Sequence, residues 1–297
     1  MTHFSKNTQK TQKIWKEWLL TLPSLLMLIT LVGIPMLIIL LTSFRERSDL
    51  GGVGAEWSLD AFRNIFASWN NIFYPIIKRT LIYTTLTTIL CILLGLPVAF
   101  MIARAKPWIR NLLTLLVLIP FWTNMLVHIS AWKMVLHSDG ALRNFLLWIG
   151  CISEQTKLLG NSSSVILVMV HIFLPFAILP LYATIQKFDF QLLESARDLG
   201  ASRCQTFLRV FLPGISPGII AAGLLVFIPV LGCYVVPDLM GGMNTDMLSN
   251  KIVQRTLSDR NIPEAAALAS GMLLSLCFAW LICRSFMTFR NRKEVSP

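Results

Sequence analysis

Charged residues are scarce in this chain. Asp, Glu, Lys and Arg together make up 14% of its 297 residues, whereas a soluble domain usually carries about a quarter. Hydrophobic residues account for 55% of the sequence, and the mean hydropathy is +0.66. So few charges cannot solvate the surface of a water-soluble domain, and the composition therefore predicts a protein surrounded mainly by lipid.

Signatures of catalysis and metal binding are also missing. The four histidines, at positions 3, 128, 137 and 171, form no H-E-x-x-H pair, and the sequence has no G-x-S-x-G element. The six cysteines, at 91, 151, 204, 233, 277 and 283, have neither a disulfide-framework pattern nor metal-ligand spacing. A G-x-x-x-x-G-K-[ST] phosphate loop is absent as well. We therefore predict no catalytic residue, metal site or cofactor on this chain, and an intramembrane enzyme is disfavoured.

Long apolar runs are what the sequence has in abundance. Each is about 19–27 residues long, enough to cross a ~30 Å hydrocarbon core as a helix. They lie at 18–44, 80–103, 111–136, 163–186, 215–237 and 265–283. The first run is longer than a signal-peptide core and lacks a small-residue cleavage site. The predicted fold class is an all-α membrane protein with six transmembrane helices.

The distribution of Lys and Arg predicts the orientation of these helices. With the N-terminus inside, the inner segments carry 15 of the 26 basic residues but only 5 of the 15 acidic ones. Both termini and the loop at 187–214 are then cytoplasmic. The formal net charge of +11 therefore indicates membrane orientation and contact with lipid head groups, and nucleic acid is not an expected partner.

The same runs divide the chain into segments. These are a cytoplasmic N-terminal segment at 1–17, a first transmembrane helix at 18–44, an outer segment at 45–79, a five-helix core at 80–285 and a cytoplasmic tail at 286–297. The outer segment is amphipathic and rich in Trp and Phe, so it is expected to lie along the outer interface, either as a plain surface helix or as a docking surface. A short apolar helix, too brief to span, is predicted at 141–149.

The polar stretch 189–218 interrupts the apolar runs of the second half, and its signals predict two short helices. Asp189 is a cap for the first helix, and Gly200 stands where that helix is expected to end in a left-handed residue. Ser202 and Gln205 have capping-box spacing for the second helix, which Pro213 is expected to stop. Small residues at the joint would let a partner protein approach the backbone closely. The alternative interpretation is an ordinary loop that folds against its own membrane helices.

The joint also carries a longer pattern. Glu194-Ser195-Ala196, then Gly200, then Val210-Phe211-Leu212-Pro213 resembles the EAA loop of ATP-binding-cassette (ABC) importer permeases. The spacing matches throughout; Ser195 replaces an alanine and Val210 an isoleucine. The resemblance implies the type I importer permease fold, with residues 189–213 of the five-helix core as the coupling loop that seats in a groove of a cytoplasmic ATPase. The residues it assigns to coupling are Glu194, Ser195, Ala196, Gly200, Ala201 and Pro213.

Polar and aromatic groups at membrane depth are the candidates for a substrate path. In the third run, Pro120 predicts a kink, and Trp122 and Asn124 follow it. Trp122 either holds a cation over its ring or simply packs at the interface. At the end of the fifth run, Asp238 either attracts a cation or caps the next turn, with Tyr234 one helical turn before it.

Three passages together extend the resemblance. The 120–124 stretch, the EAA loop and Asp238-Leu239-Met240-Gly241-Gly242 resemble the permeases of spermidine/putrescine importers over residues 20–285, PotB-like subunits first and PotH-like putrescine subunits next. This implies an inner-membrane permease that works by alternating access. The implied partners are a PotC-like or PotI-like second permease, two copies of a PotA-like or PotG-like ATPase that binds ATP and Mg²⁺, and a periplasmic polyamine-binding protein. Alternatives are an ABC permease for another small solute and an ion-coupled secondary carrier.

Overall fold

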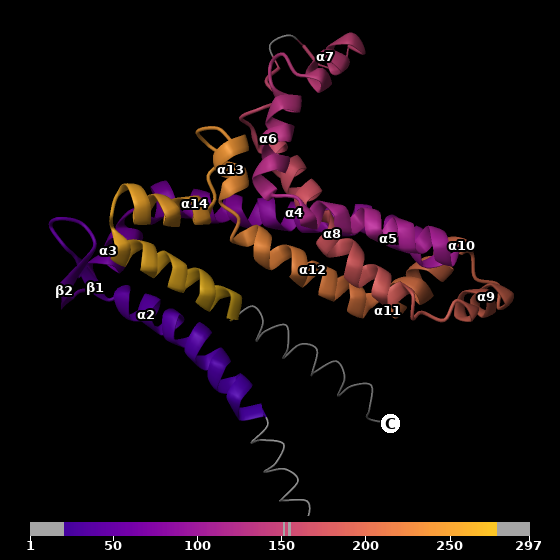
Figure 1. Cartoon of the computed structure of the whole chain (residues 1–297), viewed down its shortest axis with the longest axis horizontal. Coiled ribbons are helices and arrows are strands. Elements are labelled where there is room, and N and C mark those ends of the chain that lie inside the picture. The colour runs from indigo at the N-terminus through magenta and orange to yellow at the C-terminus, as the bar shows by residue number, and fades with distance from the viewer. Residues whose placement is uncertain (1–20, 151, 154–155, 278–297) are drawn as a thin grey trace, which may run out of the picture. The chain divides into compact units, whose positions relative to one another are not determined.

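The computed structural model describes residues 21–150, 152–153 and 156–277 (Figure 1). Two compact units make up this part of the chain. Residues 70–251 form the larger one, here the core unit, and residues up to 69 together with those from 252 form the terminal unit. The predicted segments 1–17 and 286–297 lie outside the described residues.

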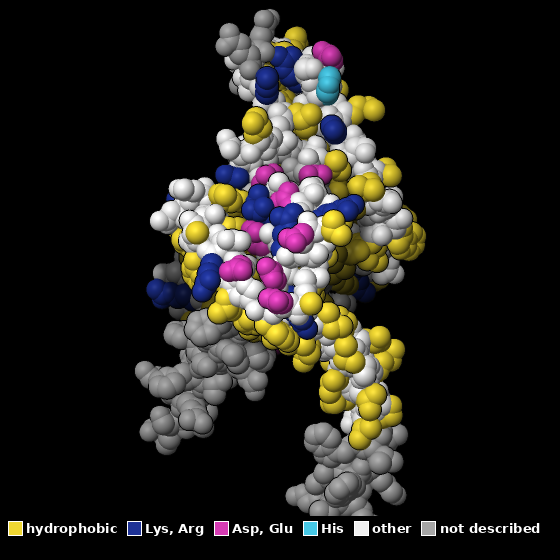
Figure 2. All heavy atoms as spheres, turned by 90° about the vertical axis from the view of Figure 1, so that its left-hand side faces the viewer, with side chains coloured by type: hydrophobic (Ala, Val, Ile, Leu, Met, Phe, Trp, Pro, Cys, Tyr) yellow, Lys and Arg dark blue, Asp and Glu magenta, His cyan; other side chains and the backbone are white. Residues whose placement is uncertain are grey.

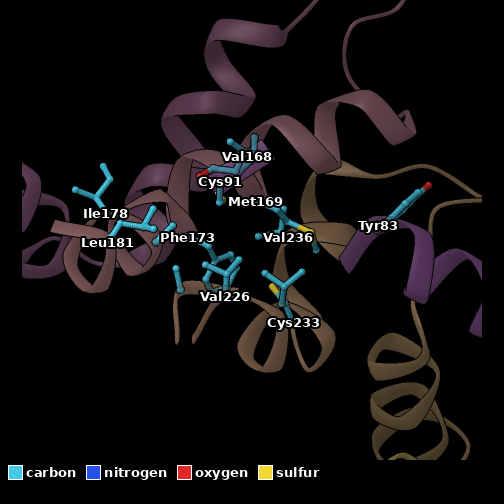
Figure 3. Packing of buried hydrophobic residues seen from close by; sticks show 14 of the residues in the cluster. Tyr83, Cys91, Val168, Met169, Phe173, Ile178, Leu181, Val226, Cys233 and Val236 are labelled. Atoms are coloured by element: carbon cyan, nitrogen blue, oxygen red, sulfur yellow. Dashed lines mark hydrogen bonds between the residues drawn. The ribbon is translucent and has the colours of Figure 1, made fainter. Parts of the chain in front are cut away.

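Three long apolar helices make the centre of the core unit. They are α4 (Tyr74–Arg104), α8 (Ser162–Ile185) and α12 (Ser216–Leu231). Helix α4 packs against α8, and α12 packs against both. Their contact is filled by buried residues from each helix, among them Cys91, Met169 and Val226 (Figure 3). Such helices are apolar on all sides because lipid surrounds the faces that protein does not cover.

Polar groups in this core are satisfied locally or between helices. The Thr88 hydroxyl donates to the carbonyl of Thr84 at 2.7 Å in its own helix, and the hydroxyl of Tyr83 in α4 donates to Ser162 at the start of α8 at 2.6 Å. Asn161 caps α8 in a reciprocal capping box with Ser164. These bonds matter because lipid offers no water to an unpaired donor or acceptor.

Two breaks in the helices bend the chain. Helix α5 (Pro107–Trp122) ends at the predicted kink, and the chain turns by 93° into α6 (Met125–Leu136), which leads to α7 (Ala141–Trp148). The short helix α7 confirms the prediction at 141–149. A second bend of 65° precedes α12. Beyond α12 the core unit continues through α13 (Val235–Met240) into α14 (Leu248–Val253).

In the described residues, three helices are long and apolar enough to cross a membrane, or five if each bent pair counts as one span. The single helices are Thr21–Thr42, Trp69–Arg104 and Ser162–Ile185. The sixth predicted span begins within the apolar helix Ile262–Cys277, and the rest of it lies outside the described residues.

The terminal unit begins with a helix whose surface is apolar all round. It runs through the π-helical turn η1 (Ile29–Gly33) into α2 (Ile34–Thr42), and its large hydrophobic side chains are exposed in the isolated chain. Figure 2 shows these side chains covering the helix. A helix of this kind is stable only when lipid or protein surrounds it.

The outer segment contains a structure that the sequence did not predict. Strands β1 (Arg45–Arg47) and β2 (Val53–Trp57) pair antiparallel before α3 (Asp60–Ala67), and the π-helical turn η2 (Trp69–Phe73) then leads into α4. The expectation of an amphipathic helix is met only by α3. Glycines 51 and 52 have positive φ angles of 86° and 96°, which a hairpin turn needs. Figure 2 views the molecule from the side on which Figure 1 labels β1, β2 and α3, and it shows Lys and Arg side chains interspersed with Asp and Glu there.

A nearly buried ion pair organises the other half of the terminal unit. Arg255, in the π-helical turn η4 (Gln254–Ser258), lies 3.0 Å from Glu264, which is 4% exposed, and 2.8 Å from Asp259. The backbone carbonyl of Asp259 accepts a bond from Arg47 in the hairpin at 2.8 Å. The contacts of Arg255 with Glu264 and Asp259 therefore stabilise the turn at 255–264, and the hydrogen bond from Arg47 connects this turn to the hairpin.

Removal of this guanidinium is expected to destabilise the protein clearly. Arg255→Met removes the guanidinium that lies against the buried Glu264 carboxylate, and breaking a buried ion pair costs on the order of 3 kcal/mol. The exposed pair Arg63–Asp60 is the matched control, and Arg63→Met is expected to cost less than about 1 kcal/mol. Thermal unfolding of the purified protein in detergent measures both, and equal midpoints for the two variants would contradict the expectation.

Candidate functional site

The EAA loop (residues 189–213) folds as two short helices joined at glycine. Helix α9 (Gln191–Asp198) begins with a bond from the Gln191 N–H to the Asp189 carboxylate at 2.9 Å. Gly200 follows the C-cap residue of this helix; its φ is +89°, and its N–H donates to the Arg197 carbonyl at 2.8 Å. The predicted cap and the left-handed glycine are both confirmed.

The second helix also starts as predicted but continues further. Ser202 and Gln205 form a capping box at the start of α10 (Arg203–Thr206). The helix then widens into the π-turn η3 (Phe207–Phe211) and passes through Pro213 in α11 (Leu212–Gly214). The helix ends at Gly214, one residue after the predicted stop at Pro213. Pro213 lies in the first turn after a π-turn, where its missing N–H costs little, and the chain bends only at Ile215.

The residues of the predicted coupling set lie on the surface of this joint. Glu194, Ser195, Gly200 and Pro213 are exposed, and Ala196 and Ala201 are half-buried. Nothing lies within 4 Å of the position where a Cβ on Gly200 would stand. Large apolar side chains are bare beside them, namely Leu192, Leu199, Phe207 and Leu208, with Leu199 89% exposed. Small residues surrounded by uncovered apolar ones form a surface suited to a protein partner.

An aromatic cluster fixes the loop to the membrane helices. We name it the aromatic clamp; it consists of Phe100, Phe188, Phe190, Phe207 and Phe211. The central ring belongs to Phe211, which is 1% exposed and lies edge-on to Phe100 at 5.5 Å and to Phe188 at 5.4 Å. Because Phe100 belongs to α4 and Phe188 follows α8, the clamp links the loop to both central helices.

Two further contacts tighten the clamp. The guanidinium of Arg104 lies over Phe190 and Phe100, with its central carbon 5.4 and 5.7 Å from the ring centroids. Gly214 lies so close to the Phe188 ring that a Cβ there would collide with it. Sequence reasoning identified the apolar flank of Phe207 and Phe211 but missed the other clamp residues. The one local signal was a pair of phenylalanines on either side of Asp189.

The first pair of substrate-path candidates lies at the α5–α6 bend. Trp122 ends α5 and is 82% exposed. Asn124 is the N-cap of α6, and its side-chain oxygen accepts a bond from the Leu126 N–H at 2.8 Å. The amide therefore has a structural task at the break, which the sequence interpretation did not include.

The second pair lies on α13. The Asp238 N–H donates to the Tyr234 carbonyl at 3.1 Å, which confirms that the two residues are one helical turn apart. Both side chains are exposed, and α13 ends on a backbone bond from Gly241 to Pro237. Helices α6 and α13 are in contact (Figure 1), so the fold brings the two candidate pairs onto neighbouring elements.

Comparisons with known proteins agree with this geometry. Residues 92–288 match the model of the family described as "Binding-protein-dependent transport system inner membrane component". The spermidine/putrescine transport system permease protein PotB of Salmonella typhimurium is 36% identical over 97% of this chain and 98% of its own length. PotB of Haemophilus influenzae is 37% identical over 90% and 92%.

Solved structures show the same fold. A chain from the crystal structure of a bacterial ABC transporter involved in alginate import superimposes with a TM-score of 0.70 at 20% identity, covering 98% of this chain and all of that one. A second alginate transporter structure, in complex with an alginate-bound periplasmic protein, gives a TM-score of 0.66 at 20% identity and coverages of 97% and 99%. The chain therefore belongs to the family of binding-protein-dependent transport system inner membrane components, and it has the fold of an ABC importer permease.

Proposed function

We propose that this permease is a subunit of an ATP-driven importer of polyamines such as spermidine and putrescine. The observation that carries the proposal is identity of 36% along nearly the whole chain with relatives named as spermidine/putrescine permeases. The similarity includes the membrane helices and the bends between them, the elements that would shape a substrate path. A permease for another small solute is the alternative.

The proposed assembly contains a PotC-like or PotI-like second permease, two copies of a PotA-like or PotG-like ATPase and a periplasmic polyamine-binding protein. ATP and Mg²⁺ would bind to the ATPase, because this sequence has no phosphate loop. The EAA loop would seat in a groove of that ATPase. Support comes from the exposed Glu194 and Gly200 and from the uncovered Leu199 beside them.

Alternating access would then move the polyamine. Closure of the ATPase dimer on ATP draws the EAA loops of the two permeases together, and the aromatic clamp passes this movement to α4 and α8. The proposed path includes Trp122, Asn124, Tyr234 and Asp238. An exposed tryptophan face and an exposed carboxylate both attract cations. Both termini and the EAA loop would lie in the cytosol, in agreement with the positive-inside distribution.

Uptake by the reconstituted importer tests the proposal. Proteoliposomes that hold the two permeases and the ATPase, supplied with the cognate binding protein, are expected to accumulate radiolabelled spermidine or putrescine only when ATP is present. Excess unlabelled polyamine should remove the signal, and an unrelated sugar should not. ATP-dependent uptake of another solute, with none of either polyamine, would assign the permease to the alternative.

A further inference from the structure

Helix α5 turns into α6 beside α8 (Figure 1). Residues of these three helices and of the bend line a cavity in the core unit. Its volume is about 200 Å³. One wall is aromatic, with Phe121 and Phe176 at a ring distance of 4.8 Å and Phe173 next to Phe176 at 5.9 Å. Pro120, near the end of α5, and Pro175, inside α8, also line the cavity.

Polar groups lie together at one part of the lining. His128 in α6 and His171 in α8 have ring centroids 5.5 Å apart, and the Thr123 hydroxyl is hydrogen-bonded to His128 Nε2. The ring of Trp132 lies edge-on to His171 at 5.6 Å. In the sequence the two histidines are 43 positions apart and looked unrelated, so only the packing of α6 on α8 makes them a pair.

The position of His171 within the membrane argues against a purely structural role for this ionisable side chain. His171 comes nine residues after the start of α8, which places it about 14 Å along a helix that crosses a core of ~30 Å. Ionisable side chains at this depth are rare and usually mark a substrate or proton pathway. His171 is exposed in the isolated subunit and therefore available to a ligand.

The lining selects a particular ligand chemistry. A neutral imidazole offers a ring nitrogen as acceptor to an ammonium N–H, and aromatic faces attract the same cation. The phenylalanine wall suits a chain of methylene groups. No Asp or Glu is among the described residues that line the cavity. Binding without a carboxylate is weak, and a transport site needs weak binding because the substrate must leave again.

We propose that this cavity, the histidine cavity, holds one ammonium group of a polyamine and its adjoining methylene chain during passage through the permease. The ammonium lies between His128 and His171, and the methylene groups lie along the phenylalanine wall. The proposal rests on the proposed function and adds to it a specific binding position, with residues outside the path inferred from the sequence.

Direct binding of spermidine tests the proposal. The probe is radiolabelled spermidine added to the membrane complex of both permeases and a hydrolysis-deficient ATPase, held with ATP and without the binding protein. His171→Leu removes the acceptor and is expected to weaken spermidine binding about tenfold, as loss of one hydrogen bond to a charged group does. His171→Gln restores an acceptor and is expected to bind within about twofold of the unmodified complex.

Two further variants control for folding and for position. His137→Leu changes an exposed histidine outside the cavity and should leave binding unchanged. Thr123→Val keeps the side-chain volume but removes the hydroxyl that holds His128, and it should weaken binding as well. If His171→Leu fails to assemble with its partners, Thr123→Val and His171→Gln decide the question.

The outcomes separate this inference from the proposed function. Unchanged binding in His171→Leu and Thr123→Val, or no spermidine bound by the unmodified complex, overturns the histidine cavity. If the complete importer still takes up spermidine in either case, the proposed function stands. If the complete importer takes up no polyamine at all, both proposals fall together.

Discussion

Phe211→Ala is expected to separate ATP hydrolysis from uptake in the assembled importer. Phe211 is 1% exposed and contacts Phe100, Phe188 and Phe207, so its loss opens a cavity in the centre of the aromatic clamp. The loop would then move without carrying α4 and α8 with it. We expect transport per ATP to fall about tenfold, within the range of mutations that weaken coupling between sites.

The same substitution also affects stability. Loss of a buried phenylalanine ring costs about 3–5 kcal/mol in a packed core, and for that reason the milder Phe211→Leu belongs in the experiment. Phe145→Ala, on the exposed face of α7, is the matched control, since that side chain is 55% exposed. ATPase activity and radiolabelled uptake are measured on the same proteoliposomes. If the ratio of uptake to ATP hydrolysis is unchanged in an assembled Phe211→Leu complex, the aromatic clamp does not transmit the movement of the loop to α4 and α8.

Gly200→Leu is expected to abolish attachment of the ATPase. The φ of +89° makes any side chain at Gly200 costly by about 1–2 kcal/mol, and a leucine there would also project into the space that a docked partner needs. The protein offers a close control for the first effect. Gly150 follows α7 as Gly200 follows α9, has a φ of +78°, and likewise has nothing within 4 Å.

Comparison of the two leucine variants isolates docking from backbone strain. Both are expected to lose similar thermal stability, but only Gly200→Leu should fail to retain the ATPase during purification and to drive ATP-dependent uptake. Retention of the ATPase with full uptake in Gly200→Leu would remove the coupling role from this joint. Equal losses of uptake in Gly150→Leu would assign the effect to strain.

Structural features that depend on a few neighbouring residues were predicted well from the sequence. The glycine that follows α9 and the capping box of Ser202 and Gln205 depend on bonds that span three or four residues, so local spacing determines them. The kink after Pro120 is local for the same reason. The end of the second helix was predicted to within one residue, although the π-turn before Pro213 was not foreseen.

The sequence by itself determined that the chain lies in a membrane, where its apolar helices fall, and how the joint at Gly200 is built. The tertiary structure decided which distant residues meet. Phe100 reaches Phe211 across 111 positions, and His128 meets His171 across 43, only because α4, α6 and α8 pack together. The physical reason is that capping, turn geometry and hydrophobicity act within a few residues, whereas contacts between helices depend on how whole faces fit.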